Sequence, residues 1–263
     1  MFVSFLVATY NCADRVHVLL NTARSLSEFP CEFLISDGAS QDGTLRMLEG
    51  HPNVRISRSS PDLGIYDAWN QGLNACQGEY ISFLGVDDKP GYDFLKAALL
   101  EFELGAQPAF IYGDSVLSSN NLFRKLSSPK SPKLFESDRP LFDIPHPGSL
   151  NHRSLFDKNR FDPTFRLAGD LDFYIRIRDQ IKHRGYLCIP QIQAIIDAHG
   201  ISRSAKAYRL YREEFERIEK NLGLELHYSS RRLNLLSSFE RYPKLFDALR
   251  SLAWNIRGQR HVG

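Results

Sequence analysis

Short apolar runs alternate with amphipathic stretches along the first two hundred residues of the chain. The apolar runs are rich in β-branched and aromatic residues and end in polar turns, which is typical of buried strands. They cover residues 2–8, 33–36, 54–56 and 80–84. Between them, apolar positions recur at the three- to four-residue spacing of a helix, over residues 16–26, 44–48 and 68–75. The alternation predicts an α/β domain with a mainly parallel sheet flanked by helices.

The pattern changes past residue 200, where long amphipathic stretches follow one another. The first has its apolar positions at Tyr211, Phe215, Ile218 and Leu222. A similar spacing runs from Leu235 to Ile256 and is restarted at Pro243, which suits the first turn of a helix. We therefore expect a main domain over residues 1–205 and a helical C-terminal extension over residues 206–263.

Residues 118–140 interrupt the alternation of strands and helices. This segment is rich in Ser, Pro and Lys and has no sustained period. We expect a long loop there.

Acidic and basic residues are unevenly distributed along the chain. Residues 200–263 contain 13 Lys and Arg against 7 Asp and Glu, whereas the whole chain has a net charge of only +2. The first 199 residues are therefore mildly acidic and repel phosphate, so nucleic acid is not an expected partner. The basic extension suits an anionic membrane surface. Packing of its apolar stripe on the main domain or on a second subunit is the preferred alternative, because amphipathic helices in soluble proteins usually bury their stripe in protein.

The chain shows no signal for membrane insertion or secretion. No apolar run reaches the roughly 18 residues that a spanning helix needs, and the N-terminus lacks a basic lead-in. The four cysteines have no CxxC or other metal-ligand spacing, which disfavours structural zinc. We expect a cytoplasmic protein with reduced thiols, either free or peripheral on the inner face of the membrane.

Polar residues follow three of the predicted strands. They are residues 9–11, residues 37–44 and the pair Asp87-Asp88. In an open parallel sheet, ligands bind beyond the carboxyl ends of the strands, so these segments should converge on one site. Neither a GxGxxG turn nor a GxxxxGK[ST] loop is present, which argues against a dinucleotide fold and a P-loop. Two adjacent carboxylates can instead bind diphosphate through Mg²⁺ or Mn²⁺, although an Asp pair before a turn also serves as turn and cap chemistry.

Six segments in order resemble the family 2 glycosyltransferases. They are VATYN at 7–11, DGASQDGT at 37–44, DLGIYDAWNQGLNACQGEYISFLGVDD at 62–88, YGD at 112–114, PHPGS at 145–149 and AGDLDFYIRI at 168–177. The resemblance covers about residues 1–205 and implies the GT-A fold, a Rossmann-like sheet that binds nucleotide sugars.

The resemblance assigns a nucleotide-sugar site to Thr9, Tyr10, Asp37, Asp67, Asn70 and Asp87. The first three correspond to the base pocket, where a carboxylate accepts the imide hydrogen bond of uracil, so a UDP donor is implied. Asp67 and Asn70 lie three apart on one helix face, which suits contact with ribose or diphosphate. Asp87 corresponds to a ribose contact. Asp42, which lies nearby, is better explained as a turn or N-cap residue.

The resemblance also implies a divalent metal, Mn²⁺ or Mg²⁺. Asp88 corresponds to the metal ligand of the family's DXD-type motif, here written VDD. His199 is a second candidate ligand, because some GT-A enzymes use a histidine from this region. Arg203 is a candidate for neutralising the diphosphate, with a solvated surface arginine as the alternative.

Asp170 in AGDLDFYIRI corresponds to the family's catalytic base, which takes the proton of the acceptor hydroxyl. Gly169 stands where the family often has Glu. Asp172 lies two residues further on and is better explained as a first-turn helix carboxylate. His146 in PHPGS is a candidate for the acceptor region, or a structural histidine between prolines. Trp69 is better explained as a core residue.

The sequence therefore suggests an inverting, metal-dependent enzyme that moves a hexose from a UDP-sugar to a hydroxyl of a glycan or lipid-linked acceptor. A non-catalytic nucleotide-sugar-binding or membrane-associated scaffold of the same fold is the alternative. A sugar-nucleotide pyrophosphorylase is disfavoured, because its Gly-rich, basic N-terminal signature is absent after Ala8.

Overall fold

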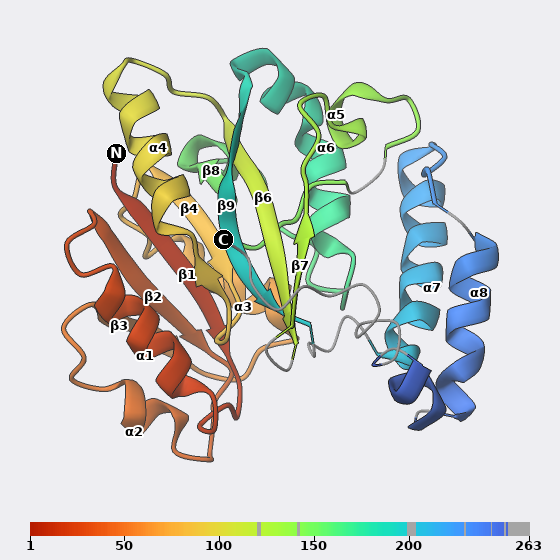
Figure 1. The fold of residues 1–263 in the computed structure, drawn as a ribbon, viewed down its shortest axis with the longest axis horizontal. Helices are drawn as coiled ribbons and strands as arrows, with labels where there is room; N and C mark the ends of the chain where they lie inside the picture. Colours follow the sequence, from red (N-terminus) through yellow and green to blue (C-terminus); the bar gives the residue numbers. More distant parts are fainter. Residues whose placement is uncertain are drawn as a thin grey trace.

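The computed structural model describes residues 1–119, 122–140, 143–198, 204–228, 230–242, 244–249 and 251. Within these ranges, nine strands form one sheet in the order β3-β2-β1-β4-β8-β6-β9-β5, and β7 pairs with β6 (Figure 1). The strands are β1 (Val3–Thr9), β2 (Cys31–Asp37), β3 (Val54–Ser59), β4 (Tyr80–Leu84), β5 (Lys89–Pro90), β6 (Phe110–Ser119), β7 (Leu122–Leu126), β8 (Leu150–His152) and β9 (Tyr186–Asp197).

The sheet has a parallel half and a mixed half. Strands β3, β2, β1 and β4 are parallel neighbours, so their carboxyl ends share one edge. Beyond them, β8 runs antiparallel to both β4 and β6, while β9 is parallel to β6 and antiparallel to β5. The predicted α/β architecture with a mainly parallel sheet is confirmed, and the antiparallel strands extend it.

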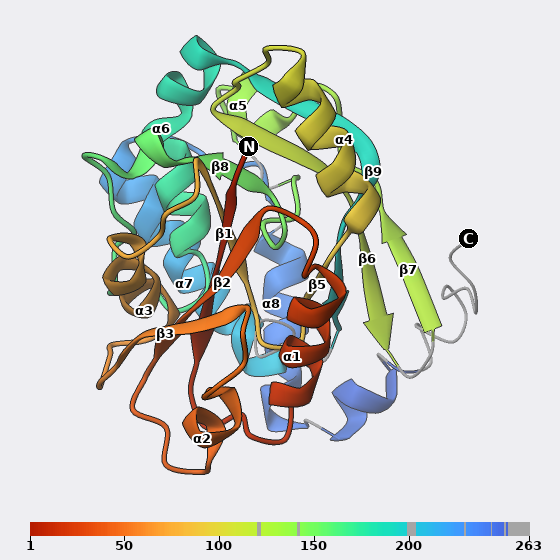
Figure 2. The ribbon, with the colours of Figure 1, turned by 90° about the vertical axis from the view of Figure 1, so that its left-hand side faces the viewer.

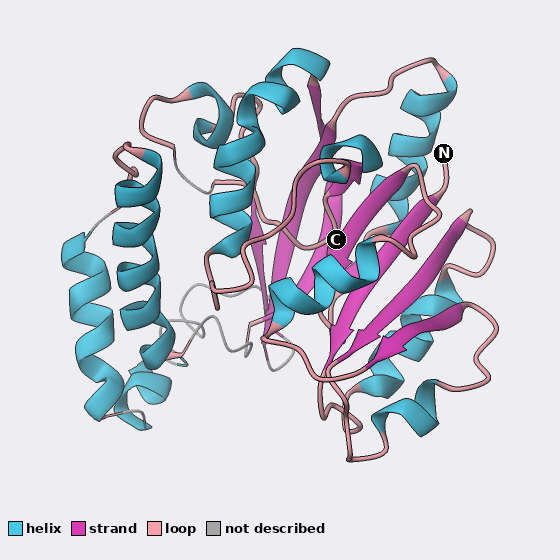
Figure 3. Cartoon of the chain, turned by 180° about the vertical axis from the view of Figure 1, so that it is seen from behind, coloured by secondary structure: helices cyan, strands magenta, loops and turns pink. Residues whose placement is uncertain are grey.

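Helices cover both faces of the sheet. They are α1 (Val16–Ser25), α2 (Thr44–Leu48), α3 (Ile65–Leu73), α4 (Tyr92–Glu103), α5 (Lys133–Glu136), α6 (Gly169–Arg184), α7 (Ala205–Leu222) and α8 (Ser230–Ser238), with 3₁₀ turns at Arg153–Phe156 and Phe239–Arg241. Figure 2 shows α1 and α3 on opposite sides of the parallel half, and Figure 3 shows α3 and α6 from behind.

Strand residues alternate between two hydrophobic cores. In β1, Phe5 and Val7 belong to the cluster under α1 and α4, whereas Leu6 belongs to the cluster under α3 and α6. In β2, Phe33 and Leu34 divide in the same way. Because both faces are buried, each strand reads as a continuous apolar run rather than as an alternating one.

The prediction of a long loop at 118–140 is wrong in part. The segment contains β7, which pairs antiparallel with the end of β6, and the single helical turn α5. β7 spans five residues on the outside of the sheet and α5 spans four, so neither is long enough to display a period of 2 or 3.6 in the sequence.

The predicted amphipathic helix after residue 200 is confirmed as α7. Its residue Ile218 is completely buried in the core cluster that also contains Phe161 and Phe165. Figures 1 and 3 show α7 and α8 beside α6. Of the later stripe, Phe246 packs on Tyr208, whereas Leu235, Leu245 and Leu249 are exposed. Pro243, Arg250 and residues 252–263, which carry the rest of the predicted stripe, lie outside the described residues.

In the part of the chain that the structure describes, no helix is both long enough and apolar enough to cross a membrane.

Candidate active site

The carboxyl ends of β1 and β2 bring Thr9 and Asp37 together, as predicted. The two residues are register partners, and Thr9 Oγ1 donates a hydrogen bond of 2.9 Å to Asp37 Oδ1. Asp37 also accepts hydrogen bonds from the backbone N–H and hydroxyl of Ser40 and from the hydroxyl of Ser59. Burial opposes ionisation, but these hydrogen bonds outweigh it and lower the pKa of Asp37. Asp37 is thus an ionised, buried anchor for the loop that follows β2.

The loops that follow β1 and β2 carry the exposed ring of Tyr10 and the carboxylate of Asp42. The ring of Tyr10 is 66% exposed, and a Cβ built on Gly38 would lie 3.2 Å from its Cδ2 atom. Asp42 accepts hydrogen bonds from the backbone N–H of Ala13 and from both the N–H and hydroxyl of Thr44. These contacts confirm Asp42 as a turn residue, whereas the N-cap position of α2 belongs to Gly43.

Asp67 and Asn70 lie on α3, but their contacts differ. Asp67 Oδ2 accepts a hydrogen bond of 2.9 Å from the N–H of Leu63. The amide of Asn70 donates to the carbonyl of Phe161 and accepts from its N–H, at 2.8 and 3.0 Å. The structure therefore gives Asn70 a structural role in joining α3 to the segment before α6, and its predicted contact with the nucleotide sugar remains a prediction.

Asp87 and Asp88 follow β4 and lie in different surroundings. Asp87 forms an ion pair of 3.1 Å with Arg15. Asp88 is buried and accepts a hydrogen bond of 2.7 Å from the N–H of Gly85. Burial raises the pKa of Asp88 to about 7, and the carboxylates of Asp87 and Asp197 add to the rise.

Asp197 is an acidic neighbour of Asp88 that the sequence pattern does not predict. It ends β9, and the pairing of Lys89 with Ile195 brings this end of β9 beside the residues before β5. The carboxylate of Asp88 offers the kind of oxygen donor that hard divalent cations prefer. His199 and Arg203 lie outside the described residues, and among the described ones no group of three or more His, Cys, Asp and Glu side chains forms a ready-made metal site.

Asp170 lies in the first turn of α6 and faces α3. Its side chain is only 17% exposed, and Oδ1 accepts a hydrogen bond of 2.9 Å from the N–H of Leu171. The hydroxyl of Tyr66, from the first turn of α3, lies 3.3 Å from Oδ1 and also donates to the carbonyl of Leu167. Burial raises the pKa of Asp170 to about 6. A carboxylate with this pKa is ionised at neutral pH and is a better base than an exposed aspartate.

His146 also lies close to Asp170. Its Nδ1 atom lies 4.0 Å from Asp170 Oδ2, its ring is 5% exposed, and burial lowers its pKa to about 3. The buried amide of Gln193 holds this loop by donating to the carbonyls of Pro145 and Pro147. The structure thus places a neutral imidazole next to Asp170.

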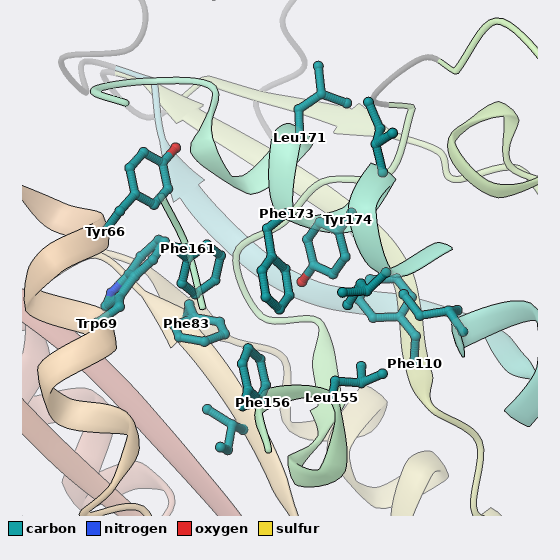
Figure 4. Close-up of a cluster of buried hydrophobic side chains, with 14 of the residues drawn as sticks. Tyr66, Trp69, Phe83, Phe110, Leu155, Phe156, Phe161, Leu171, Phe173 and Tyr174 are labelled. Atoms are coloured by element: carbon teal, nitrogen blue, oxygen red, sulfur yellow. The ribbon is translucent and has the colours of Figure 1, made fainter. Parts of the chain in front are cut away.

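An aromatic cluster forms the floor beneath Asp170. It lies between α3 and α6, as Figure 4 shows, and includes Tyr66, Trp69, Phe83, Phe161, Phe173 and Tyr174. The ring of His146 lies 5.3 Å from that of Trp69 and 5.4 Å from that of Phe83. Among the described residues, neither His146 Nε2 nor Trp69 Nε1 has a hydrogen-bond partner. Trp69 is a core residue, as expected.

Asp172 and Gly169, which lie on either side of Asp170 in the sequence, have contacts that explain them structurally. Asp172 is buried and pairs with Arg176 at 2.8 Å, which agrees with a structural carboxylate, although its partner is a side chain rather than the helix end. A Cβ on Gly169 would lie 2.7 Å from Cε2 of Tyr66. The ring of Tyr66 therefore fills the space that a glutamate at this position would need, which accounts for the departure from the family pattern.

The chain is similar to several proteins of known sequence. Residues 4–160 match the sequence profile of Glycosyl transferase family 2. The PGL/p-HBAD biosynthesis glycosyltransferase of Mycobacterium bovis is 30% identical over 181 residues, which cover 66% of this chain and 68% of that protein. The chondroitin synthase of Escherichia coli is 24% identical over 233 residues, covering 84% of this chain but only 32% of that protein.

Solved structures show the same fold. TarS residues 1–349 of S. aureus, in complex with UDP-GlcNAc, align over 90% of this chain and 70% of that one, with a TM-score of 0.59 and 16% identity. The mannosyltransferase PcManGT of Pyrobaculum calidifontis, in complex with GDP-Man and Mn²⁺, aligns over 81% and 64%, with a TM-score of 0.53 and 18% identity.

The fold and the family profile define a glycosyltransferase of the GT-A class. Within that class, the chain belongs to glycosyl transferase family 2.

The contact between Gly169 and Tyr66 can be tested by substitution. We expect Gly169→Ala to lower the free energy of unfolding by about 1–3 kcal/mol, because its Cβ would lie 2.7 Å from the ring. The melting temperature should fall accordingly. Thermal denaturation measures this cost. In a Tyr66→Leu background, which removes the outer ring atoms, the same alanine should cost less. An equal cost in both backgrounds would show that the ring does not exclude a side chain at position 169.

Proposed function

We propose that this family 2 glycosyltransferase is an inverting, metal-dependent enzyme that transfers a hexose from a UDP-sugar to a hydroxyl of a glycan or lipid-linked acceptor. The observation that carries the proposal is the buried Asp170, whose pKa of about 6 suits a general base. The hydroxyl of Tyr66 contacts this carboxylate from α3. Asp62, in the segment before α3, lies close to the predicted pocket for the nucleotide base, because a Cβ on Gly38 would lie 2.8 Å from Asp62 Oδ2.

In this mechanism Asp170 accepts the proton of the acceptor hydroxyl as that oxygen attacks the anomeric carbon. The bond from this carbon to the diphosphate oxygen breaks on the opposite face, so the anomeric configuration inverts. Tyr66 contacts Asp170 Oδ1, and its hydroxyl has the carbonyl of Leu167 as a second acceptor. This arrangement lets the phenol donate to the ionised carboxylate or accept from the protonated one. Neutral His146 does not compete for the proton, because burial keeps its pKa at about 3.

At the donor end, Asp88 would hold Mn²⁺ or Mg²⁺, with His199 proposed as a second ligand. A divalent cation there supplies positive charge for the diphosphate, which two carboxylates alone would repel. Asp87 and Thr9, with Asp67 and Asn70, are proposed contacts of the nucleotide sugar, and Tyr10 offers an exposed ring to the base. TarS binding UDP-GlcNAc and PcManGT binding GDP-Man with Mn²⁺ support a nucleotide-sugar donor and a metal.

The acceptor is proposed from two kinds of relatives and one surface. The similar proteins include a chondroitin synthase and a PGL/p-HBAD biosynthesis glycosyltransferase. On this chain the C-terminal helices expose Leu235, Tyr242, Leu245 and Leu249, and Arg241 and Lys244 are exposed beside them. An apolar and basic surface of this kind suits an anionic leaflet, which would bring the active site to a lipid-linked acceptor.

The base can be tested by removing its charge. Asp170→Asn should leave binding of the UDP-sugar near normal and lower transfer about 100-fold or more. In the unchanged enzyme, kcat at saturating donor and metal should fall about tenfold per pH unit below about pH 6, because protonated Asp170 cannot accept a proton. Asp172→Asn is the matched control. If Asp170→Asn stays active while Asp172→Asn is inactive, the wrong carboxylate has been chosen. Native activity in both would show that neither carboxylate is the base, whereas no transfer by the unchanged chain would favour the scaffold.

The metal can be tested by direct binding measurements. UDP affinity, followed by calorimetry, should drop in chelator and recover on addition of Mn²⁺, and Asp88→Ala should abolish this recovery. Asp93→Asn provides a control carboxylate, since Asp93 is exposed in the first turn of α4. Unchanged UDP affinity in chelator would contradict a bridging cation.

Membrane binding can be tested by co-sedimentation with anionic liposomes. The full chain should bind them at low salt and detach at high salt, because each surface cation contributes about 1 kcal/mol that salt screens. Replacing Leu245 and Leu249 by Ser should weaken binding, whereas Leu104→Ser, at an exposed leucine after α4, should not. If the full chain does not bind, the exposed leucines serve another purpose.

A further inference from the structure

A carboxylate from the C-terminal extension lies buried behind the catalytic loop. Glu214, in the middle of α7, is only 5% exposed. Its Oε1 accepts a hydrogen bond of 2.6 Å from the N–H of Arg166, and its Oε2 accepts from the N–H groups of Leu167 and Ala168 at 3.0 and 2.7 Å. One side chain thus satisfies three successive backbone donors.

These three donors belong to the turn that starts α6. Ala168 is the N-cap residue of α6, and no side chain of the chain's own turn caps it. Successive backbone N–H groups in a turn form a concave site for a negative group. An N-cap side chain would accept from N–H groups inside the helix, whereas the N–H groups of residues 166–168 precede it. Glu214 supplies their carboxylate from 46 to 48 residues further along the chain.

A second residue of α7 fastens the same segment. Arg217 forms an ion pair of 2.7 Å with Asp162, and its guanidinium lies 4.0 Å above the ring of Phe165. Together with the buried Ile218, these contacts fix the segment before α6 from the side opposite α3. Asp170 follows Ala168 by two residues, so its position depends on this turn.

We propose that Glu214 is a positioning residue for transfer: by holding the N–H groups of residues 166–168, it fixes the turn that presents Asp170 to the acceptor. The inference rests on the proposed role of Asp170 as the base. It gives the C-terminal helices a part in the reaction that does not depend on a membrane.

The charge of Glu214 provides a signature that simple packing would lack. Among the residues that the structure describes, the titratable groups that face Asp170 are Tyr66 from α3, His146 from its loop, Tyr174 from α6 itself and Glu214 from α7. Burial is the main cause of the raised pKa of Asp170, and the negative charge of Glu214 raises it further. Removing that charge should lower the pKa of Asp170 and move the acidic limb of the kcat profile to lower pH.

The test is Glu214→Gln in the full chain. Glutamine keeps the shape but offers one acceptor oxygen for three donors. We expect kcat to fall between about 10- and 100-fold, with KM for the donor unchanged and the acidic limb shifted to lower pH. Glu216→Gln is the matched control, because Glu216 is exposed on the same helix and should leave kcat and the pH profile as they are. Native kcat and an unmoved limb in Glu214→Gln would overturn the proposal.

A double variant separates this proposal from that for Asp170. If Glu214 acts through Asp170, adding Glu214→Gln to Asp170→Asn should cause no further loss of transfer, whereas additive losses would show that Glu214 acts elsewhere. An Asp170→Asn enzyme with native activity would refute the base itself, whatever Glu214→Gln does. If Glu214→Gln melts below the assay temperature, Glu214→Asp takes its place; it should regain part of kcat with the acidic limb at its native pH, and a displaced limb would overturn the proposal.

Discussion

A carboxylate that acts as a base must be shielded enough from water for its pKa to rise toward neutral pH. It must also accept enough hydrogen bonds to be stable when it is ionised. Asp170 meets both demands. The aromatic floor and α6 remove it from water, and the N–H of Leu171 and the hydroxyl of Tyr66 contact its oxygen. Much of the surrounding structure follows from this constraint. Tyr66 must reach Asp170, so Gly169 has no side chain, and the turn before α6 must be satisfied from outside.

The pKa of Asp37 shifts in the opposite direction to those of Asp88 and Asp170. Asp37 is as buried as any residue in the protein, yet hydrogen bonds from Ser40, Ser59 and Thr9 lower its pKa. Asp88 and Asp170 have few such donors, and burial raises their pKa values. A low pKa suits a permanent anchor, whereas a raised pKa suits a group whose charge is taken up by a cation or a proton. The environments separate three aspartates that a composition count would treat alike.

The sequence predicts those parts of the molecule that local pattern determines. Buried strands, the helices between them and the strand-end positions of Thr9, Asp37 and Asp88 follow from runs and periods, and the position of Asp170 follows from a family motif. Elements of four or five residues, such as α5 and β7, are too short for any period. Asp197 could not be foreseen because its place depends on which strands pair. Glu214 could not be distinguished from Glu213 and Glu216 in the same amphipathic helix, since only tertiary packing buries it.

The contact between Glu214 and the turn before α6 also sets an order of assembly. During synthesis the parallel strands and α6 leave the ribosome first, but the three amides of residues 166–168 find their carboxylate only after almost fifty further residues have emerged. Until then these three amides lack their carboxylate, and on the proposed role of Glu214 the turn that presents Asp170 would not yet be fixed. On the proposed role of Glu214, a nascent chain that has already folded its parallel strands would still lack a finished catalytic centre, and activity would begin only when α7 docks.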